Sequence, residues 1–136
     1  MKELKFRVWI ERYKKYMPIS LIDFEPISGK IVSVEVVATG GDWAKFYPEE
    51  IILEQYTGLK DKNGKEIYEG DILGGMWEGG YIAWCDKCKQ LQYHISTHEC
   101  MACLGDVQWY ELVNDNGKLE VIGNIHENPE LLGDEE

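Results

Sequence analysis

The sequence predicts a mainly β fold, α+β at most, in which a small sheet-like or barrel-like domain carries only short helices. Short runs rich in β-branched and aromatic residues recur along the 136-residue chain, and such residues fit the pleated surface of a sheet. Glycine- and asparagine-rich turns separate these runs, as in folds made of many short strands. With 44% apolar and 12% aromatic residues, the chain has enough hydrophobic side chains for a core. A single domain over residues 1–136 is therefore expected.

Two strands are predicted in the first forty residues. Residues 4–10 alternate apolar with polar side chains, which is the period of a half-buried strand. Residues 30–37 are rich in valine and isoleucine, and Gly40 and Gly41 end this second strand. Between the two strands, residues 11–17 fit either a turn or a short helix.

The next segment leaves two interpretations open. Pro48 followed by two glutamates is typical of a helix start. The apolar residues 51–53 could equally begin a strand. Both alternatives are retained for residues 46–56.

A hairpin is predicted around Asn63 and Gly64, because both positions of the commonest two-residue turn favour positive φ. Asp71 is expected to accept hydrogen bonds from turn amides. Glycines that serve turns or close backbone approach are expected at three positions: Gly58, Gly64 and Gly70. The alternative to these structural roles is a ligand site formed by three side chains: Tyr56, Asp61 and Asp71.

The rest of the chain is expected to be β-like. Short strands are predicted over four segments, at residues 81–84, 91–95, 106–112 and 119–122. A polar turn at 114–117 joins the last two of them.

The four cysteines form two CxxC pairs: Cys85, Cys88, Cys100 and Cys103. Two residues between thiolates allow a tight turn to direct both sulfurs at one ion, about 2.3 Å from the metal. Two such turns complete a closed tetrahedron. This spacing predicts one structural Zn²⁺ per chain and a zinc-ribbon-like subdomain over residues 81–110.

Other uses of these cysteines fit the sequence less well. A redox-active CxxC pair normally begins a helix, and no helix is predicted after either pair. A catalytic zinc keeps an open position, whereas four thiolates fill the coordination shell. Disulfides or another metal in place of zinc stay open as alternatives. His94 and His98 could substitute as ligands but are expected at the surface or beside the ligands, and His126 is expected in a surface loop.

The charge balance also bears on partners and location. With 14 basic and 25 acidic residues, the chain carries a formal charge of −11, which repels phosphate backbones unless basic residues gather on one face. The acidic tail over residues 127–136 is expected to be frayed. No apolar stretch approaches the length of a membrane span, and the first residues lack a signal-peptide core. A cytoplasmic protein without a membrane partner is expected.

Three segments resemble the YopX family of bacteriophage and prophage proteins. They read KFRVW at 5–9, QYTGLKDKNGKEIYEGDI at 55–72 and VIGNIHENPEL at 121–131, and they keep the family's order. The resemblance implies a small, mostly β phage protein in the bacterial host cytoplasm, without catalytic residues. The CxxC pairs lie in a region that varies within the family, so the zinc prediction depends on their spacing alone.

These observations predict a non-enzymatic phage or prophage accessory protein that acts as a zinc-stabilised protein-interaction module. No catalytic residues and no cofactor other than Zn²⁺ are expected. The predicted partner is a phage or host protein, and a homo-oligomer is compatible with the sequence. Trp77, in a glycine-rich loop, is the candidate partner-facing aromatic residue. The alternative is a nucleic-acid-binding zinc ribbon that uses Lys87 and Lys89, or an acidic DNA mimic.

Overall fold

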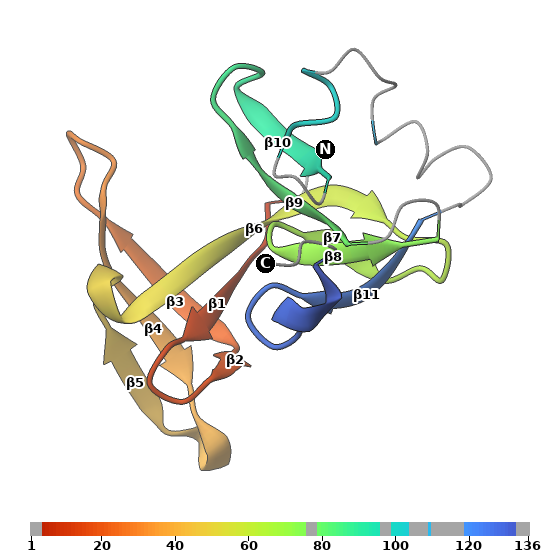
Figure 1. Cartoon of the computed structure of the whole chain (residues 1–136). Coiled ribbons are helices and arrows are strands. Elements are labelled where there is room, and N and C mark those ends of the chain that lie inside the picture. Colours follow the sequence, from red (N-terminus) through yellow and green to blue (C-terminus); the bar gives the residue numbers. More distant parts are fainter. Residues whose placement is uncertain (1–3, 76–78, 96–98, 104–108, 110–118, 133–136) are drawn as a thin grey trace. The chain divides into compact units, whose positions relative to one another are not determined.

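The structure, a computed structural model, describes residues 4–75, 79–95, 99–103, 109 and 119–132. The chain divides into two compact units (Figure 1). The N-terminal unit comprises residues 5–55, and the C-terminal unit comprises residues 56–136 together with 1–4. Within the described ranges, eleven strands are accompanied by three short 3₁₀ helices, and Trp109 is helical. This content confirms the predicted mainly β class. The single domain over 1–136 and the subdomain over 81–110 stay predictions.

The N-terminal unit consists of two antiparallel groups of strands. Its elements are β1 (Phe6–Ile10), β2 (Lys15–Met17), β3 (Ile19–Phe24), β4 (Ile31–Val37), η1 (Thr39–Gly41), β5 (Trp43–Phe46), η2 (Pro48–Glu50) and the first half of β6 (Ile51–Lys60). Strand β1 pairs with both β2 and β6, and β4 pairs with both β3 and β5. The buried core of this unit consists of Val8, Ile10, Met17, Val34, Val36, Phe46 and Ile51.

Both ambiguous segments of this unit have a clear structure. Residues 11–14 form a turn and not a helix, and β2 follows directly. At 46–56 both interpretations hold in succession, since η2 spans Pro48–Glu50 and β6 begins at Ile51. The carboxylate of Glu50 accepts a hydrogen bond from the amide of Tyr47 at 3.0 Å, which satisfies a donor at the start of the short helix.

A buried carboxylate lies between β1, β2 and β6. Glu54 is only 1% exposed. Its Oε1 atom accepts hydrogen bonds from Arg7 Nε and from the Tyr16 hydroxyl, both at 2.8 Å. The Arg7 guanidinium also lies 4.4 Å from the centre of the Tyr16 ring. The negative charge is therefore paired and hydrogen-bonded, as a carboxylate removed from water must be.

The C-terminal unit contains a four-stranded antiparallel sheet with the order β10-β9-β8-β11. Its elements are the second half of β6, β7 (Glu66–Tyr68), β8 (Asp71–Gly74), β9 (Gly80–Cys85), β10 (Gln90–His94), β11 (Glu120–Asn124) and η3 (Pro129–Leu131). The strands predicted near 81–84, 91–95 and 119–122 are thereby confirmed. The core of this unit consists of Ile67, Leu73, Ile82, Tyr93, Met101, Trp109 and Leu119.

Strands β9 and β10 pack closely because one position has no side chain. A Cβ atom at Gly80 would collide with the hydroxyl end of Tyr93. The ring of Tyr93 is fully buried, and this burial raises the pKa of Tyr93 to about 12. The glycine thus allows a large aromatic residue to fill the core beneath the hairpin.

The predicted hairpin is confirmed, but its turn is longer than two residues. Strands β6 and β7 are joined after the pair Lys60 and Glu66. Gly64 has φ 83°, whereas Asn63 is not among the described residues with positive φ. The prediction of positive φ at both positions is therefore wrong. A single left-handed glycine suffices because the side chain of Asp61 organises the rest of the turn.

Asp61 connects the hairpin to β11. Its Oδ1 atom accepts hydrogen bonds from the amides of Asn63 and Lys65, each at 2.9 Å. Its Oδ2 atom accepts a third, from the amide of Val121, at 2.9 Å. Burial raises the pKa of Asp61, but these three amide donors outweigh it and lower the pKa below the ordinary value. The carboxylate is therefore a structural group.

The other structural roles predicted for this segment are confirmed. Gly58 and Gly70 have φ of 89° and 91°, a region that favours glycine. The Oδ2 atom of Asp71 accepts a hydrogen bond from the amide of Tyr68 at 2.8 Å. Tyr56 is buried, and its ring lies 5.4 Å from that of Tyr68. These contacts support structural roles over the alternative ligand site.

We expect Asp61→Asn to lower the free energy of unfolding at pH 7 by about 1–3 kcal/mol, because an amide cannot accept from donors on both sides. A lowered pKa in the folded state means that this contribution is present above the ordinary pKa of 3.8 and is lost as the pH falls through the folded value. Urea denaturation should therefore show a smaller difference between variant and parent at pH 3 than at pH 7. The exposed Asp42→Asn is the control. A difference that does not change with pH would contradict the role of the carboxylate.

Several expectations fall at the end of the chain or outside the described residues. The expectation of a frayed tail is wrong for residues 127–132, because Asn124 Nδ2 donates to Glu127 Oε1 at 2.9 Å and η3 follows. Of the predicted strand at 106–112, the structure describes Trp109 alone. This residue is helical, so the strand prediction is wrong there, and the remainder lies outside the described residues. The turn at 114–117, the residues 133–136, Trp77 and His98 also lie outside them.

Candidate metal centre

Two turns in the C-terminal unit position the four cysteines. Cys85 is the last residue of β9, and Cys88 lies in the turn that leads to β10. The left-handed Lys89 (φ 59°) closes this turn, and its amide donates to the carbonyl of Cys85 at 2.8 Å. Cys100 forms a β-bridge with His94, which pairs with Tyr81 at the end of the β9–β10 hairpin away from the turn. The amide of Met101 then donates to the carbonyl of Tyr93 at 3.0 Å, so the second CxxC pair begins beside β10.

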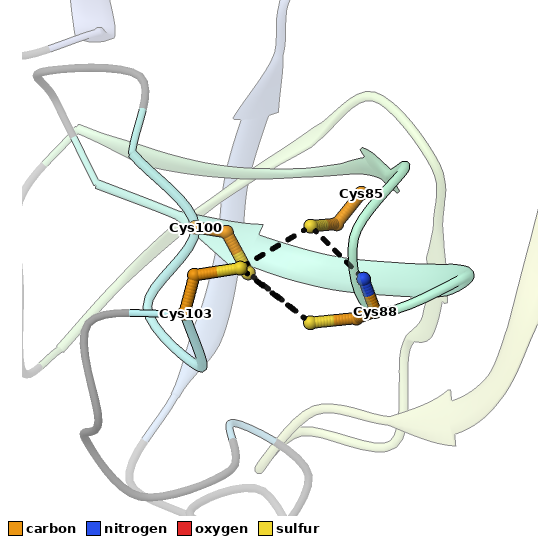
Figure 2. Close-up of side chains that lie close together, drawn as sticks. All are labelled: Cys85, Cys88, Cys100 and Cys103. Atoms are coloured by element: carbon orange, nitrogen blue, oxygen red, sulfur yellow. Dashed lines mark hydrogen bonds between the residues drawn. The ribbon is translucent and has the colours of Figure 1, made fainter.

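The four sulfur atoms converge on one point (Figure 2). All of them lie within 4.8 Å of one another. The Sγ atom of Cys103 is 3.6 Å from that of Cys85 and 3.7 Å from that of Cys88. Four sulfurs at about 2.3 Å from a tetrahedral Zn²⁺ are separated by about 3.8 Å. The arrangement therefore fits a single metal ion with four thiolate ligands, and all four thiols are free.

Hydrogen bonds within the cluster shift the pKa values of the thiols in different directions. The amide of Cys88 donates to Cys85 Sγ at 3.5 Å and, with smaller contributions from neighbouring groups, lowers the pKa of Cys85 to about 7. The side chains of Cys85 and Cys88 instead raise the pKa of Cys103 to about 12. Burial raises the pKa of Cys88. Such crowded thiols lose their protons together only when a cation balances the thiolates.

The cluster is partly covered by protein. Cys85 and Cys100 are buried, Cys88 is half-buried and Cys103 is exposed. Four protein ligands leave no position for water or substrate, which is the arrangement of a structural site and not of a catalytic one. Among the residues that the structure describes, the group able to hold a metal ion consists of these four cysteines alone.

The histidines have other surroundings. His94 is buried, its Nδ1 atom lies 3.1 Å from the carbonyl oxygen of Gln92, and its ring stacks on Tyr81 with the ring centres 5.3 Å apart. The structure thus places it beside the cysteines and outside the ligand group, as expected. His126 lies in the turn after β11, where its amide donates to Asn124 Oδ1 at 3.0 Å.

The sequence did not indicate a cavity of about 420 Å³ beside the cysteines. Besides three of the cysteines, the described residues that line it are Trp84, Asp86, Lys87, His94 and Glu99. Trp84 is 52% exposed, whereas Trp9 and Trp109 are buried. The only signal in the sequence is that Trp84 and Asp86 directly flank the first cysteine. Lys89 is not among the lining residues.

Comparisons with known proteins found a matching family and a similar solved structure. The model of one protein family, described as YopX protein, matches residues 5–133. The chain is also similar to the crystal structure of protein EF1440 from Enterococcus faecalis, with a TM-score of 0.66 and 26% sequence identity. That similarity covers 97% of this chain and 99% of the other. No curated protein matches the chain. None of the described helices has the length and apolar character needed to cross a membrane.

Proposed function

From the premise that the chain belongs to the YopX family, whose model matches residues 5–133, we propose that it is a non-enzymatic protein-interaction module stabilised by one structural Zn²⁺. It acts in the cytoplasm of a bacterial host as an accessory protein of a phage or prophage, and its partner is a phage or host protein. The observation that carries the zinc part of this proposal is the convergence of four cysteine sulfurs within 4.8 Å of one another.

The choice of zinc follows from ligand chemistry. Four thiolates are soft ligands, and a tetrahedral set of four sulfurs is typical of Zn²⁺ or of iron–sulfur chemistry. Two CxxC turns around a single point fit one ion, as in structural zinc sites. Because such a site forms only when the chain brings its ligands together, the free energy of metal binding adds to the stability of the C-terminal unit.

The proposal of a non-enzymatic role has two supports. A tetrathiolate shell is coordinatively closed, so the metal would not present an open position to a substrate. The carboxylates of the alternative ligand site, those of Asp61 and Asp71, accept hydrogen bonds from backbone amides. A binding role uses the surface of the protein and requires neither group to react.

The test is the intact mass of the protein under native and denaturing conditions, with metal analysis, after purification without chelator. We expect one zinc per chain, released on denaturation together with four reactive thiols. A protein without metal, with a mass lower by about 2 Da for each disulfide formed, would overturn the zinc assignment. An iron content in place of zinc would overturn it as well.

A further inference from the structure

We propose that the cavity beside the cysteine cluster receives an arginine or lysine side chain from a basic segment of a protein partner. This inference rests on the proposed function, because it specifies where and how the zinc-stabilised module would bind a protein. This open hollow, which includes the space beside three of the cysteines, measures about 420 Å³. Sites that bind a small ligand or a long side chain have volumes of this order.

An aromatic ring and a carboxylate are held together at this cavity. Trp84 Nε1 donates a hydrogen bond to Asp86 Oδ1 at 3.1 Å. This contact holds the indole in a defined position although half of its surface is exposed. A cation over an indole face is attracted by the ring quadrupole, and a neighbouring carboxylate adds a charged hydrogen-bond acceptor. Together the two groups offer what a guanidinium or an ammonium group binds.

The charge around the cavity is negative, which favours the binding of a cation. Among the described residues that line it, Asp86 and Glu99 carry carboxylates and Lys87 carries an ammonium group. A Zn²⁺ ion held by the four thiolates would add a net charge of −2 to this region. The whole chain carries −11, so a basic partner would be attracted from a distance.

A nucleic acid would be repelled by the negative charge around this cavity. Its phosphates would approach two carboxylates and a negative metal centre, which disfavours binding. Of the lining residues that the structure describes, Lys87 alone carries an ammonium or guanidinium group, and a single ammonium group does not form a basic face. The electrostatics therefore favour a basic protein segment.

The probe is a fluorescently labelled, capped peptide of alternating arginine and glycine, titrated into the zinc-loaded full chain and followed by fluorescence anisotropy. A peptide of alternating glutamate and glycine is the charge control. We expect the arginine peptide to bind and the glutamate peptide not to bind. Raising the salt concentration should weaken the binding.

Two variants locate the binding. Trp84→Leu should lower the affinity for the arginine peptide by about fivefold or more, because the aromatic face is lost. Asp86→Asn keeps a hydrogen-bond acceptor for the indole but removes the negative charge, and should lower this affinity by about threefold. Trp43→Leu is the matched control, because Trp43 is 63% exposed in the N-terminal unit. It should bind within about twofold of the parent. If Trp84→Leu does not retain zinc, the peptide affinity of Asp86→Asn relative to the parent tests the inference.

Three results would overturn the inference: no binding of the arginine peptide, equal loss in Trp84→Leu and Trp43→Leu, or tighter binding of a single-stranded oligothymidylate than of the arginine peptide. The zinc content, measured on the same samples, separates this inference from the proposed function. One zinc per chain without peptide binding refutes the inference alone. Peptide binding that depends on Trp84 in a metal-free protein refutes only the zinc assignment.

Discussion

Cys85→Ser should abolish stoichiometric zinc binding and destabilise the C-terminal unit by on the order of 3 kcal/mol or more. Cys85 ends β9 and supplies one of the four sulfurs, and the amide of Cys88 lowers the pKa of this thiol to about 7. A serine hydroxyl is a poor ligand for Zn²⁺, and three remaining thiolates no longer form a closed shell. Because metal binding contributes directly to folding in such sites, its loss is a large fraction of the stability of a small protein.

Metal analysis and hydrogen exchange resolved along the chain would measure this effect. Exchange should increase most in β9 and β10, and less in the hairpin around Asn63 and Gly64. Ala83→Ser is the matched control, since it makes a similarly small change two residues earlier on the same strand without touching a ligand. If Cys85→Ser keeps its zinc and melts like the parent, the four-thiolate centre is wrong.

Glu54→Ala should lower the free energy of unfolding by about 3 kcal/mol, the largest effect expected in the N-terminal unit. The substitution removes a carboxylate that pairs with Arg7, whose side chain is only 19% exposed, and that accepts a hydrogen bond from the Tyr16 hydroxyl. Breaking a buried ion pair by removing one member typically costs about 3–5 kcal/mol. We place the effect at the lower end because water reaches part of Arg7.

Chemical denaturation of two further variants tests this explanation. Glu35→Ala removes a carboxylate that lies 3.9 Å from Lys45 in a more exposed pair of the same unit, and should change stability by about 1 kcal/mol or less. Glu54→Gln keeps the size of the side chain and a hydrogen-bond acceptor but loses the charge, so we expect an intermediate effect. Equal effects of Glu54→Ala and Glu35→Ala would show that burial of the pair contributes nothing.

The strands and the cysteine cluster could be predicted because both depend on local features. β-branched content marks β4, and a two-residue spacing fixes which cysteines can face the same ion. The burial of Glu54 could not be predicted. Its partner Arg7 is 47 residues away, and only the pairing of β1 with β6 brings the two side chains together.

The turn between β6 and β7 was predicted incorrectly for a similar reason. The local sequence Asn63–Gly64 favours a two-residue turn, but Asp61 also accepts a hydrogen bond from Val121, sixty residues later. This long-range contact holds the carboxylate where it organises a longer turn. The exposure of Trp84 could not be predicted either, because the sequence does not show whether a tryptophan in a strand faces the core or a cavity.

The pairing of β8 with β11 has a consequence for the order of folding. Gly74 and Glu120 are partners in this pairing, and the chain between them contains all four cysteines. Bringing β11 to β8 therefore closes a long loop, whose entropic penalty grows by about 0.6 kcal/mol for each doubling of its flexible length. Zn²⁺ bound beforehand would connect Cys85 to Cys103 and shorten the flexible path. The metal would thus speed the docking of a strand that supplies none of its ligands.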